Sequence, residues 1–473
     1  MTSTGRSESP VLGGTTGRLL AALAAGRLAQ SALRGLGLGG GTTLPGHIAR
    51  RIDPTFLRQA AGRLPQGVVL VSGTNGKTTT ARLLAHLATT HGWRVVHNRA
   101  GANLLPGLAA ALAPALDWQG RPRADLGVFE VDEATLPLAL AEMPVRLVVL
   151  TNLFRDQLDR YGELDSLRRR WAAALADLPA GARLVLNADD PLVASLGQVR
   201  PAAALFYGLE DPALRQEQPD HAFDARLCPC GHPLQYQGLY YAHLGQYRCP
   251  ACGFARPAPQ VAARRVVLQG LRGATVELAG QPAPLHSPLP GLYNVYNLLA
   301  VLAAAQGLGI AFTTVGPALA RFPGVFGRLE RVRLAGHDLL LALIKNPVGC
   351  NAVLRTLLSD PAPGPLAIAI NDHFADGTDI SWLWDADFEL LRDWPGPLIV
   401  GGTRAEDMRL RLKYADLPSE RIVLTHGPDG LVQAALDRAG PGEPVYLLLT
   451  YTALLEVRAV LSKRGAVAPF WAD

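Results

Sequence analysis

Short apolar runs alternate with helical patterns over much of the chain. In the first half, the apolar runs lie at residues 68–71, 126–129, 147–150 and 183–186. The segments between them carry apolar residues at helical spacing, as residues 81–88 do. Strands that alternate with helices predict a parallel sheet with helices packed on it.

A second set of such runs follows a change in composition near residues 322–327. These runs, at residues 366–370, 397–400, 422–424 and 445–449, again alternate with helical patterns. We therefore expect an α/β protein with a central domain over residues 51–325 and a separate C-terminal α/β domain over residues 326–473. Residues 1–50 are expected to form an N-terminal helix and a Gly- and Thr-rich linker.

The apolar segment at residues 18–27 has Arg at both ends and does not resemble a secretory signal. An uninterrupted apolar run of about 20 residues, as a membrane-spanning helix needs, is not found. We therefore expect a cytoplasmic protein. The N-terminal helix either packs on the body or touches the inner face of the plasma membrane.

The charge balance argues against nucleic acid as a partner. The 45 basic and 40 acidic residues give a net charge of +5 that is spread along the chain. The densest basic run, residues 168–170, is typical of a solvated helix face. Five cysteines in a cytoplasmic protein are not expected to form structural disulfides.

Residues 68–80 (VVLVSGTNGKTTT) combine a buried strand, a glycine-rich turn and a helix start. Backbone N–H groups and the helix dipole in such a turn face an anion, and Lys77 adds a positive charge. The turn itself comprises Gly73, Thr74, Asn75, Gly76, Lys77 and Thr78. Val71 departs from the strict G-x-x-x-x-G-K-[ST] pattern, and a surface turn is the alternative. We predict a nucleotide triphosphate site, in which the Thr78 hydroxyl can ligate Mg²⁺.

Three carboxylates follow the next apolar run, namely Glu130, Asp132 and Glu133. Carboxylates at the end of a parallel strand lie beside the nucleotide crevice, where Mg²⁺ needs oxygen ligands. Strand alternation puts Glu130 and Asp132 on one face and Glu133 on the other. The pattern alone fits a solvated loop equally well.

Four cysteines form two turns within residues 224–258, a segment rich in Tyr, Pro and Gly. Cys249 and Cys252 have the usual zinc-ribbon spacing, but Cys228 and Cys230 are one residue closer than is usual. Either the shortened turn still supplies both thiolates, or His232 replaces one of them. We predict a structural zinc ribbon with four cysteine ligands, inserted in the central domain, with a metal-free insert as the alternative. Cys350 stands apart and is expected to be a buried small residue.

Several motifs occur in an order that resembles the Mur ligase superfamily, whose members form amide bonds with ATP. They are residues 74–78 (TNGKT), 129–130 (FE), 151–156 (TNLFRD), 187–191 (NADDP), 291–297 (GLYNVYN) and 327–330 (GRLE). The cysteine-rich insert and residues 39–46, 345–351 and 369–384 narrow the resemblance to the MurT family, the ligase-like subunits of lipid II isoglutaminyl synthase.

This resemblance implies a set of ligand contacts. Lys77 and Thr78 would hold the triphosphate and Mg²⁺, and Glu130 would be a further Mg²⁺ ligand. The residues implied to contact ATP are Asn294, Asn297 and Arg328, with Asn187 and Asp190 near the adenine. The four cysteines would bind Zn²⁺, and the short spacing of Cys228 and Cys230 is where the insert departs from the family pattern.

The chain departs from Mur ligases in general at two points. Gln157 stands where the general pattern has His, and the lysine that those enzymes carbamoylate is not apparent after residues 161–163. An amino-acid-adding ligase would use that lysine to bind a second Mg²⁺. Its absence fits an enzyme whose nucleophile is ammonia.

The implied reaction is amidation of the α-carboxylate of D-glutamate in lipid II through an acyl phosphate. Ammonia would come from a glutaminase subunit of the GatD type, bound to the C-terminal domain. The resemblance makes Asp372 the catalytic candidate, with Asp376 as the second choice and a turn-capping role as the alternative. Two other functions stay open: a stand-alone ligase that adds an amino acid, and a non-catalytic nucleotide-binding module.

Overall fold

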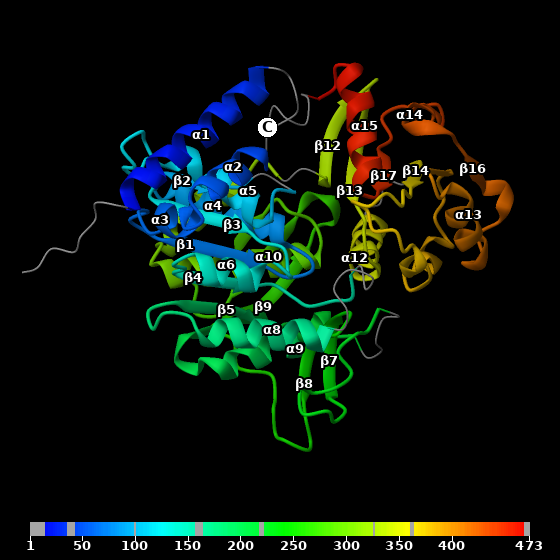
Figure 1. Ribbon diagram of the computed structural model, residues 1–473. Helices are drawn as coiled ribbons and strands as arrows, with labels where there is room; N and C mark the ends of the chain where they lie inside the picture. The colour runs from blue at the N-terminus through cyan, green and yellow to red at the C-terminus, as the bar shows by residue number, and fades with distance from the viewer. Residues whose placement is uncertain are drawn as a thin grey trace, which may run out of the picture.

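The structure is a computed structural model that describes residues 15–35, 43–98, 101–156, 164–216, 222–324, 327–359 and 364–467. In these ranges the strands form two large sheets and one small hairpin. Figure 1 shows the two sheets side by side, with the later part of the chain forming its own half of the molecule.

The first sheet has the strand order β11-β10-β9-β6-β5-β4-β1-β3-β2 in the described ranges. Neighbouring strands pair in parallel from β9 across to β2 in this order. At the other edge, β10 pairs antiparallel with β9, and β11 pairs antiparallel with β10. The strands are β1 (Val68–Ser72), β2 (Val95–His97), β3 (Leu126–Glu130), β4 (Leu147–Leu150), β5 (Arg183–Asn187), β6 (Ala204–Leu209), β9 (Val261–Leu268), β10 (Ala274–Leu278) and β11 (Leu285–Ser287).

Strand β1 lies between β3 and β4, where the chain changes its direction of travel across the sheet. A ligand crevice forms at such a switch point, outside the carboxyl ends of the strands. The sheet therefore places the phosphate loop, which directly follows β1, in the expected position.

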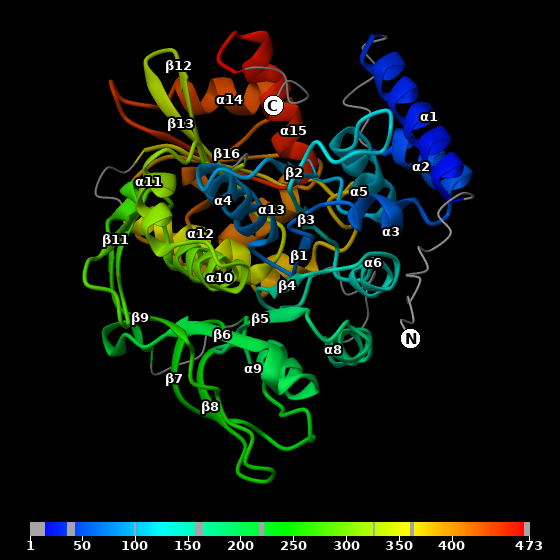
Figure 2. The same cartoon turned by 90° about the vertical axis from the view of Figure 1, so that its left-hand side faces the viewer.

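Helices cover both faces of this sheet (Figure 2). Val69 and Val71 of β1 pack on one face with α4 (Lys77–Thr90), α10 (Leu292–Leu308) and α11 (Val315–Ala320). Val68 and Leu70 pack on the other face, where the helices are α1 (Thr15–Gly35), α2 (Leu44–Ile52), α3 (Phe56–Ala61), α5 (Leu105–Leu112), α6 (Leu136–Glu142), α8 (Leu164–Ala176) and α9 (Pro191–Ser195). The four apolar residues of β1, Val68 to Val71, are thus buried on the two faces in turn, as the continuous apolar run predicts.

The second sheet has the order β12-β13-β17-β14-β15-β16 and is parallel apart from β12. Its strands are β12 (Arg328–Leu334), β13 (His337–Leu343), β14 (Leu366–Ala369), β15 (Leu398–Gly401), β16 (Ile422–Leu424) and β17 (Val445–Leu449). Its helices are α12 (Pro347–Leu358), α13 (Ala405–Tyr414), α14 (Gly427–Leu436) and α15 (Tyr451–Lys463).

The cysteine-rich insert contributes an antiparallel hairpin, β7 (Gln235–Tyr241) and β8 (Leu244–Arg248). Figure 1 shows this hairpin extending away from the body of the molecule at its lower edge.

The N-terminal helix α1 packs on α2, and its own residues Leu19, Ala22 and Leu23 are buried. Packing on the body, one of the two expectations for this helix, is therefore observed for these residues. Across the described part of the chain, no helix combines the length and the apolarity that crossing a bilayer requires.

The predicted α/β architecture with two sheets is confirmed, and the eight predicted strands all form. The domain boundary placed at residue 326 stays a prediction, although the change of sheet falls between β11 and β12. Gln157 and residues 161–163 lie outside the described residues.

Candidate functional site

The phosphate loop joins β1 to α4 through two glycines with positive φ. Gly73 has φ +134° and Gly76, which precedes the first residue of α4, has φ +87°. A Cβ on Gly73 would lie 2.1 Å from Oγ1 of Thr151, and one on Gly76 would lie 2.1 Å from Oδ1 of Asn297. Both positions therefore require glycine, and the backbone amides can approach an anion closely.

Lys77 is buried at the start of α4 and donates to three oxygens. Its Nζ lies 2.6 Å from the carbonyl oxygen of Gly73, 3.2 Å from that of Thr74 and 2.8 Å from Oε1 of Glu133. Burial lowers the pKa of Lys77, but the carboxylates of Glu133 and Glu130 outweigh it, and the net shift is upward. The amine is therefore held charged inside the loop.

Glu133 was expected on the face opposite Glu130, and that expectation is wrong. Strand β3 ends at Glu130, so the alternation of a strand does not continue to residue 133. The turn that follows brings Glu133 back to Lys77, where it is buried, and burial raises the pKa of its carboxyl group. The structure thus identifies Glu133 as the partner of the phosphate-loop lysine.

The loop after β4 holds the phosphate loop in shape. Oδ1 of Asn152 accepts from the amide of Asn75 at 2.8 Å, and the Asn152 amide group donates to the Asn75 carbonyl at 3.0 Å. Thr74 Oγ1 donates to the carbonyl of Phe154 at 3.1 Å and accepts from its amide at 3.0 Å. This bracing fixes the backbone of the loop, so an anion bound there would meet preorganised donors.

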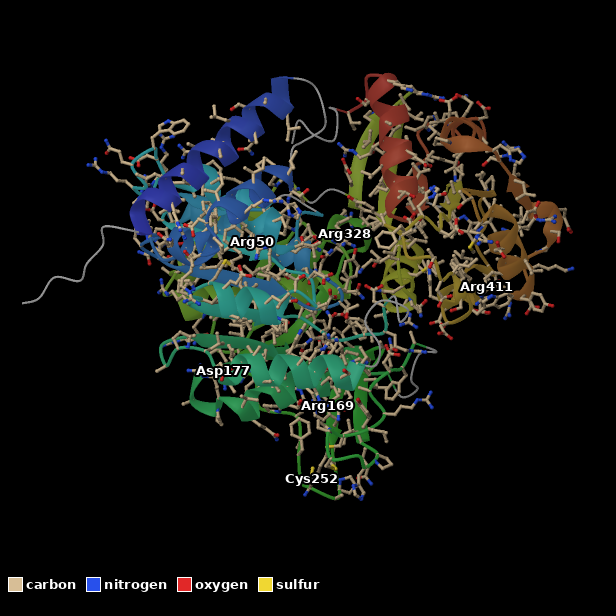
Figure 3. All side chains as sticks on the ribbon, in the orientation of Figure 1. Arg50, Arg169, Asp177, Cys252, Arg328 and Arg411 are labelled. Carbon is tan, nitrogen blue, oxygen red and sulfur yellow. The ribbon has the colours of Figure 1, made fainter. Side chains whose placement is uncertain are left out.

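Arg328 and Asn297 face the phosphate loop from other elements. Figure 3 shows Arg328 between the two halves of the molecule. Burial of this guanidinium lowers its pKa despite the nearby carboxylate of Glu130. A bound phosphate would offset this desolvation. Asn294 stands behind Asn297, because its Oδ1 accepts from the Asn297 amide group at 3.0 Å.

Two adjoining hollows lie between the sheets, and the smaller of them borders the phosphate loop. The smaller one, about 40 Å³, is lined by Asn75, Gly76, Asn297 and Arg328 among others. The larger, about 180 Å³, is mainly apolar. Residues that line both hollows are Tyr241, Tyr293, Val348 and Ala352. An apolar hollow that adjoins a phosphate loop suits a nucleotide base.

Asn187 and Asp190 do not line either hollow. The Asn187 amide group donates to the Thr151 carbonyl at 3.0 Å, and Asp190 accepts from the amides of Leu153, Leu192 and Val193. Both side chains are fully buried, and they hold the loops at the ends of β4 and β5. Their contact with adenine stays a prediction.

The C-terminal domain closes onto the phosphate loop through residues that follow β13. Asn346 and Asn75 exchange hydrogen bonds between their amide groups at 3.0 and 3.3 Å. Lys345 forms an ion pair with Asp156, which follows β4. The carboxyl ends of the two sheets therefore face each other across the cleft.

Asp372 lies just beyond β14, at the carboxyl end of the second sheet. Its carboxylate accepts from Thr403 Oγ1 and from Arg404 Nε, both at 2.8 Å. These two donors, Thr403 above all, lower the pKa of Asp372. Asp376 instead is buried and accepts from the amide and hydroxyl of Thr452, so it fixes the loop. His373 is exposed.

Thr78 and Glu130 are the oxygen donors expected for Mg²⁺. Thr78 is half-buried on the first turn of α4, and Glu130 is a buried residue at the end of β3. The negative charge of Glu130 acts on both Lys77 and Arg328, which places the carboxylate on the phosphate side of the cleft. A hydroxyl and a carboxylate next to an anion site fit Mg²⁺ shared with phosphates.

All four thiols of the insert converge. The sulfur of Cys228 lies 3.6 Å from that of Cys252, and Cys230 lies 3.6 Å from Cys249. All four sulfurs lie within 4.8 Å of one another, which suits a tetrahedral metal site. His232 lies 3.8 Å from the Cys230 sulfur and outside this group, so the short first turn supplies both of its thiols. Figure 3 shows Cys252 at the far tip of the insert.

Cys350 is fully buried in the core of the C-terminal domain, as expected. Burial raises the pKa of its thiol well above the usual range. A buried thiol with a raised pKa is poorly suited to act as a nucleophile.

Two family profiles match the chain. The profile described as Mur ligase middle domain matches residues 71–227, and the one described as MurT ligase C-terminal matches residues 343–454.

Relatives and solved structures extend the match over most of the chain. A Staphylococcus aureus protein named lipid II isoglutaminyl synthase (glutamine-hydrolyzing) subunit MurT is 35% identical over 399 residues, which are 84% of this chain and 88% of that protein. A Streptococcus pneumoniae protein of the same name is 34% identical, over 91% of this chain and 94% of that protein. The structure of a pseudomurein peptide ligase type C from Methanothermus fervidus has the same fold, with a TM-score of 0.62 at 24% identity, over 84% of this chain and 78% of that one.

Proposed function

This chain belongs to the MurT family of Mur ligases, and we propose that it is the ATP-dependent subunit of a lipid II isoglutaminyl synthase. The observation that carries this proposal is the cleft between the two sheets. One sheet brings a braced phosphate loop to the cleft, and the other brings Lys345 and Asn346, with Asp376 of the loop after Asp372 beside them.

The proposed reaction has two steps. The γ-phosphoryl group of ATP is transferred to the α-carboxylate of D-glutamate in the lipid II stem peptide, and ADP leaves. Ammonia then attacks the acyl carbon, phosphate leaves, a proton is released, and D-isoglutamine is formed.

Residues of the cleft support the first step by positioning and electrostatics. Lys77 and the N-terminus of α4 would hold the phosphates, and Arg328 would neutralise charge on the transferred group. Mg²⁺, held by Thr78 and Glu130 when bound, would neutralise further phosphate charge. The base would occupy the larger hollow.

Ammonia is proposed to come from a separate glutaminase subunit. The four thiols of the insert form the cluster, and the fifth cysteine is buried in a core, so these five residues supply no glutaminase nucleophile. Asp372 is proposed as the catalytic carboxylate that faces the partner's active site. Its lowered pKa keeps it negatively charged, which suits stabilisation of a partner imidazolium or orientation of ammonia.

The test is a glutamine- and ATP-dependent amidation assay on lipid II with the glutaminase partner present. Asp372→Asn should bind nucleotide normally and lose amidation, while Asp393→Asn, an exposed carboxylate of the same domain, should keep both. Normal amidation by Asp372→Asn would make its role structural. ADP release that depends on an added amino acid, without a partner, would instead favour a stand-alone ligase. Nucleotide binding without any turnover would favour a non-catalytic module.

The peripheral location at the membrane is also a proposal. Leu28 of α1 is 65% exposed and Trp118 beside it is 57% exposed, with Arg27 stacked on the Trp118 ring. Exposed apolar side chains next to arginine suit a bilayer interface. Sedimentation with anionic vesicles, compared between the protein and its Leu28→Ser variant, tests this contact.

A further inference from the structure

The two ends of the cysteine-rich hairpin lie in different surroundings. Its open end holds the four thiols, while its closed end is buried in the body of the first domain. At this end, Ala242 and His243 of the turn and the flanking strand residues Tyr240 and Leu244 are each at most 2% exposed. With a strand rise of about 3.3 Å per residue, the seven residues of β7 separate these ends by about 20 Å.

The buried turn forms a wall of the nucleotide hollows. Tyr241 lines both hollows, the one beside Gly76 and the larger apolar one. Its ring lies 5.5 Å from that of Tyr296 in α10 and 6.1 Å from that of Phe154. The position of this wall therefore depends on the hairpin.

The same turn also supports the phosphate loop. The ring of His243 lies 4.7 Å from the ring of Phe154. Phe154 is bonded through its backbone, in both directions, to the Thr74 hydroxyl. A shift of the hairpin would thus displace Phe154, whose backbone is hydrogen-bonded to Thr74 of the phosphate loop.

The metal site holds the open end of the hairpin together. Strand β8 ends at Arg248 and runs directly into Cys249, and Cys228 and Cys230 precede β7. Two-stranded sheets are marginal in water by themselves. A metal held by four thiolates adds folding free energy to such a segment.

We propose that metal binding by the four thiols sets the affinity of the cleft for nucleotide, because the hairpin places Tyr241 in the wall of both hollows and packs His243 on Phe154 behind the phosphate loop. The proposal rests on the proposed function in one respect, namely that the ligand of the hollows is ATP. Zn²⁺ suits a tetrahedral set of four thiolates such as this one.

The first experiment compares nucleotide affinity with and without metal. Zn²⁺ is removed from the purified protein with a chelator, and binding of a fluorescent ATP analogue is titrated before removal, after it and after Zn²⁺ is restored. Loss of aromatic contact with a base weakens binding about tenfold to a hundredfold. We expect a loss of that size, reversed by Zn²⁺. Equal affinity in the stripped and loaded protein would overturn the proposal.

Variants distinguish the effect of losing the metal from the effect of losing the Tyr241 side chain in the wall of the hollows. Cys230→Ser/Cys252→Ser removes the two exposed thiols and should reproduce the stripped protein, with metal content measured by mass spectrometry. His232→Ala, next to Cys230 but outside the cluster, should keep both metal and affinity. Tyr241→Ala should weaken nucleotide binding while the metal stays bound, so the proposal can be refuted even if the cysteine variants do not fold. Wild-type affinity in Tyr241→Ala would overturn it.

The outcomes also distinguish this proposal from the proposed function. If the Zn²⁺-loaded protein binds ATP and the stripped protein binds it equally well, only the coupling fails. If the fully loaded protein does not bind ATP at all, the proposed function itself fails.

Discussion

The ion pair between Lys77 and Glu133 makes the most demanding prediction. Both side chains are less than 10% exposed, and their charges lie 2.8 Å apart. Removing one member of a buried pair leaves an uncompensated charge and costs about 3–5 kcal/mol. We therefore expect Lys77→Met to lower the free energy of unfolding by that amount at pH 8. Lys77→Met/Glu133→Gln, which removes both charges of the pair, should stay within about 1 kcal/mol of the original protein.

The sign of the pH dependence gives a second check on the same pair. Burial already raises the pKa of Glu133, and the loss of Lys77 removes an opposing charge, so the pKa rises further. In folded Lys77→Met, the Glu133 carboxyl then stays protonated to a higher pH than in the unfolded chain, where its pKa is about 4.3. The free energy of unfolding of Lys77→Met therefore falls as the pH rises through the pKa of Glu133 in the folded protein. The loss of unfolding free energy relative to the original protein should therefore be largest at pH 8 and should shrink toward pH 5.

The assay is denaturant unfolding followed by tryptophan fluorescence. Trp171, one of seven tryptophans, is fully buried, and its Nε1 donates to the Glu133 carbonyl at 2.8 Å, so its emission is expected to change when this site unfolds. A Lys77→Met deficit below about 1 kcal/mol, or one that does not change with pH, would refute the buried-pair interpretation. Both Lys77 variants should lose ATP binding, whereas Glu133→Gln alone keeps the lysine and should retain it.

Three further results are expected. Gly76→Ala should abolish nucleotide binding in a fluorescence titration, because its Cβ would lie 2.1 Å from Asn297 Oδ1; Gly92→Ala, with φ +104° and open space around it, has the backbone strain alone and should still bind. Asp372 should stay ionised between pH 5 and 8, since its pKa is lowered, and a carboxyl NMR titration that finds a midpoint in this range would contradict the site. Cys350 should resist alkylation until the protein unfolds, as mass spectrometry can show.

Local sequence was sufficient for the strands and the phosphate loop. The continuous apolar run before Gly73 could only be buried on both faces, and the turn that follows needs glycine at both positive-φ positions. The cysteine spacing likewise predicted a cluster, although the short first turn left Cys228 uncertain. Four sulfurs converge because both turns fold back on their own backbones, at Gly231 and at Gly253.

Contacts between distant segments could not be read from the sequence. Glu133 was placed on the wrong face because strand alternation was extended past Glu130, where the strand ends. Tyr241 gave no signal, since its role depends on a hairpin tip that is buried against helices far away in the chain. The motif at residues 345–351 was recognised by resemblance, but its contact with Asn75 depends on how the two sheets are apposed.

Asn346 links the packing of the two sheets against each other to the proposed amide-forming reaction. Its Oδ1 accepts from the Gly349 amide at 2.8 Å and so caps α12, a helix that lines the larger hollow. The same side chain is bonded to Asn75 in the phosphate loop. The segment that shapes the proposed base site is therefore fastened to the proposed phosphate site, and both sites are complete only when the sheets are closed. An acyl phosphate hydrolyses in water, so an amide-forming ligase gains by assembling its site only in a cleft from which water is excluded.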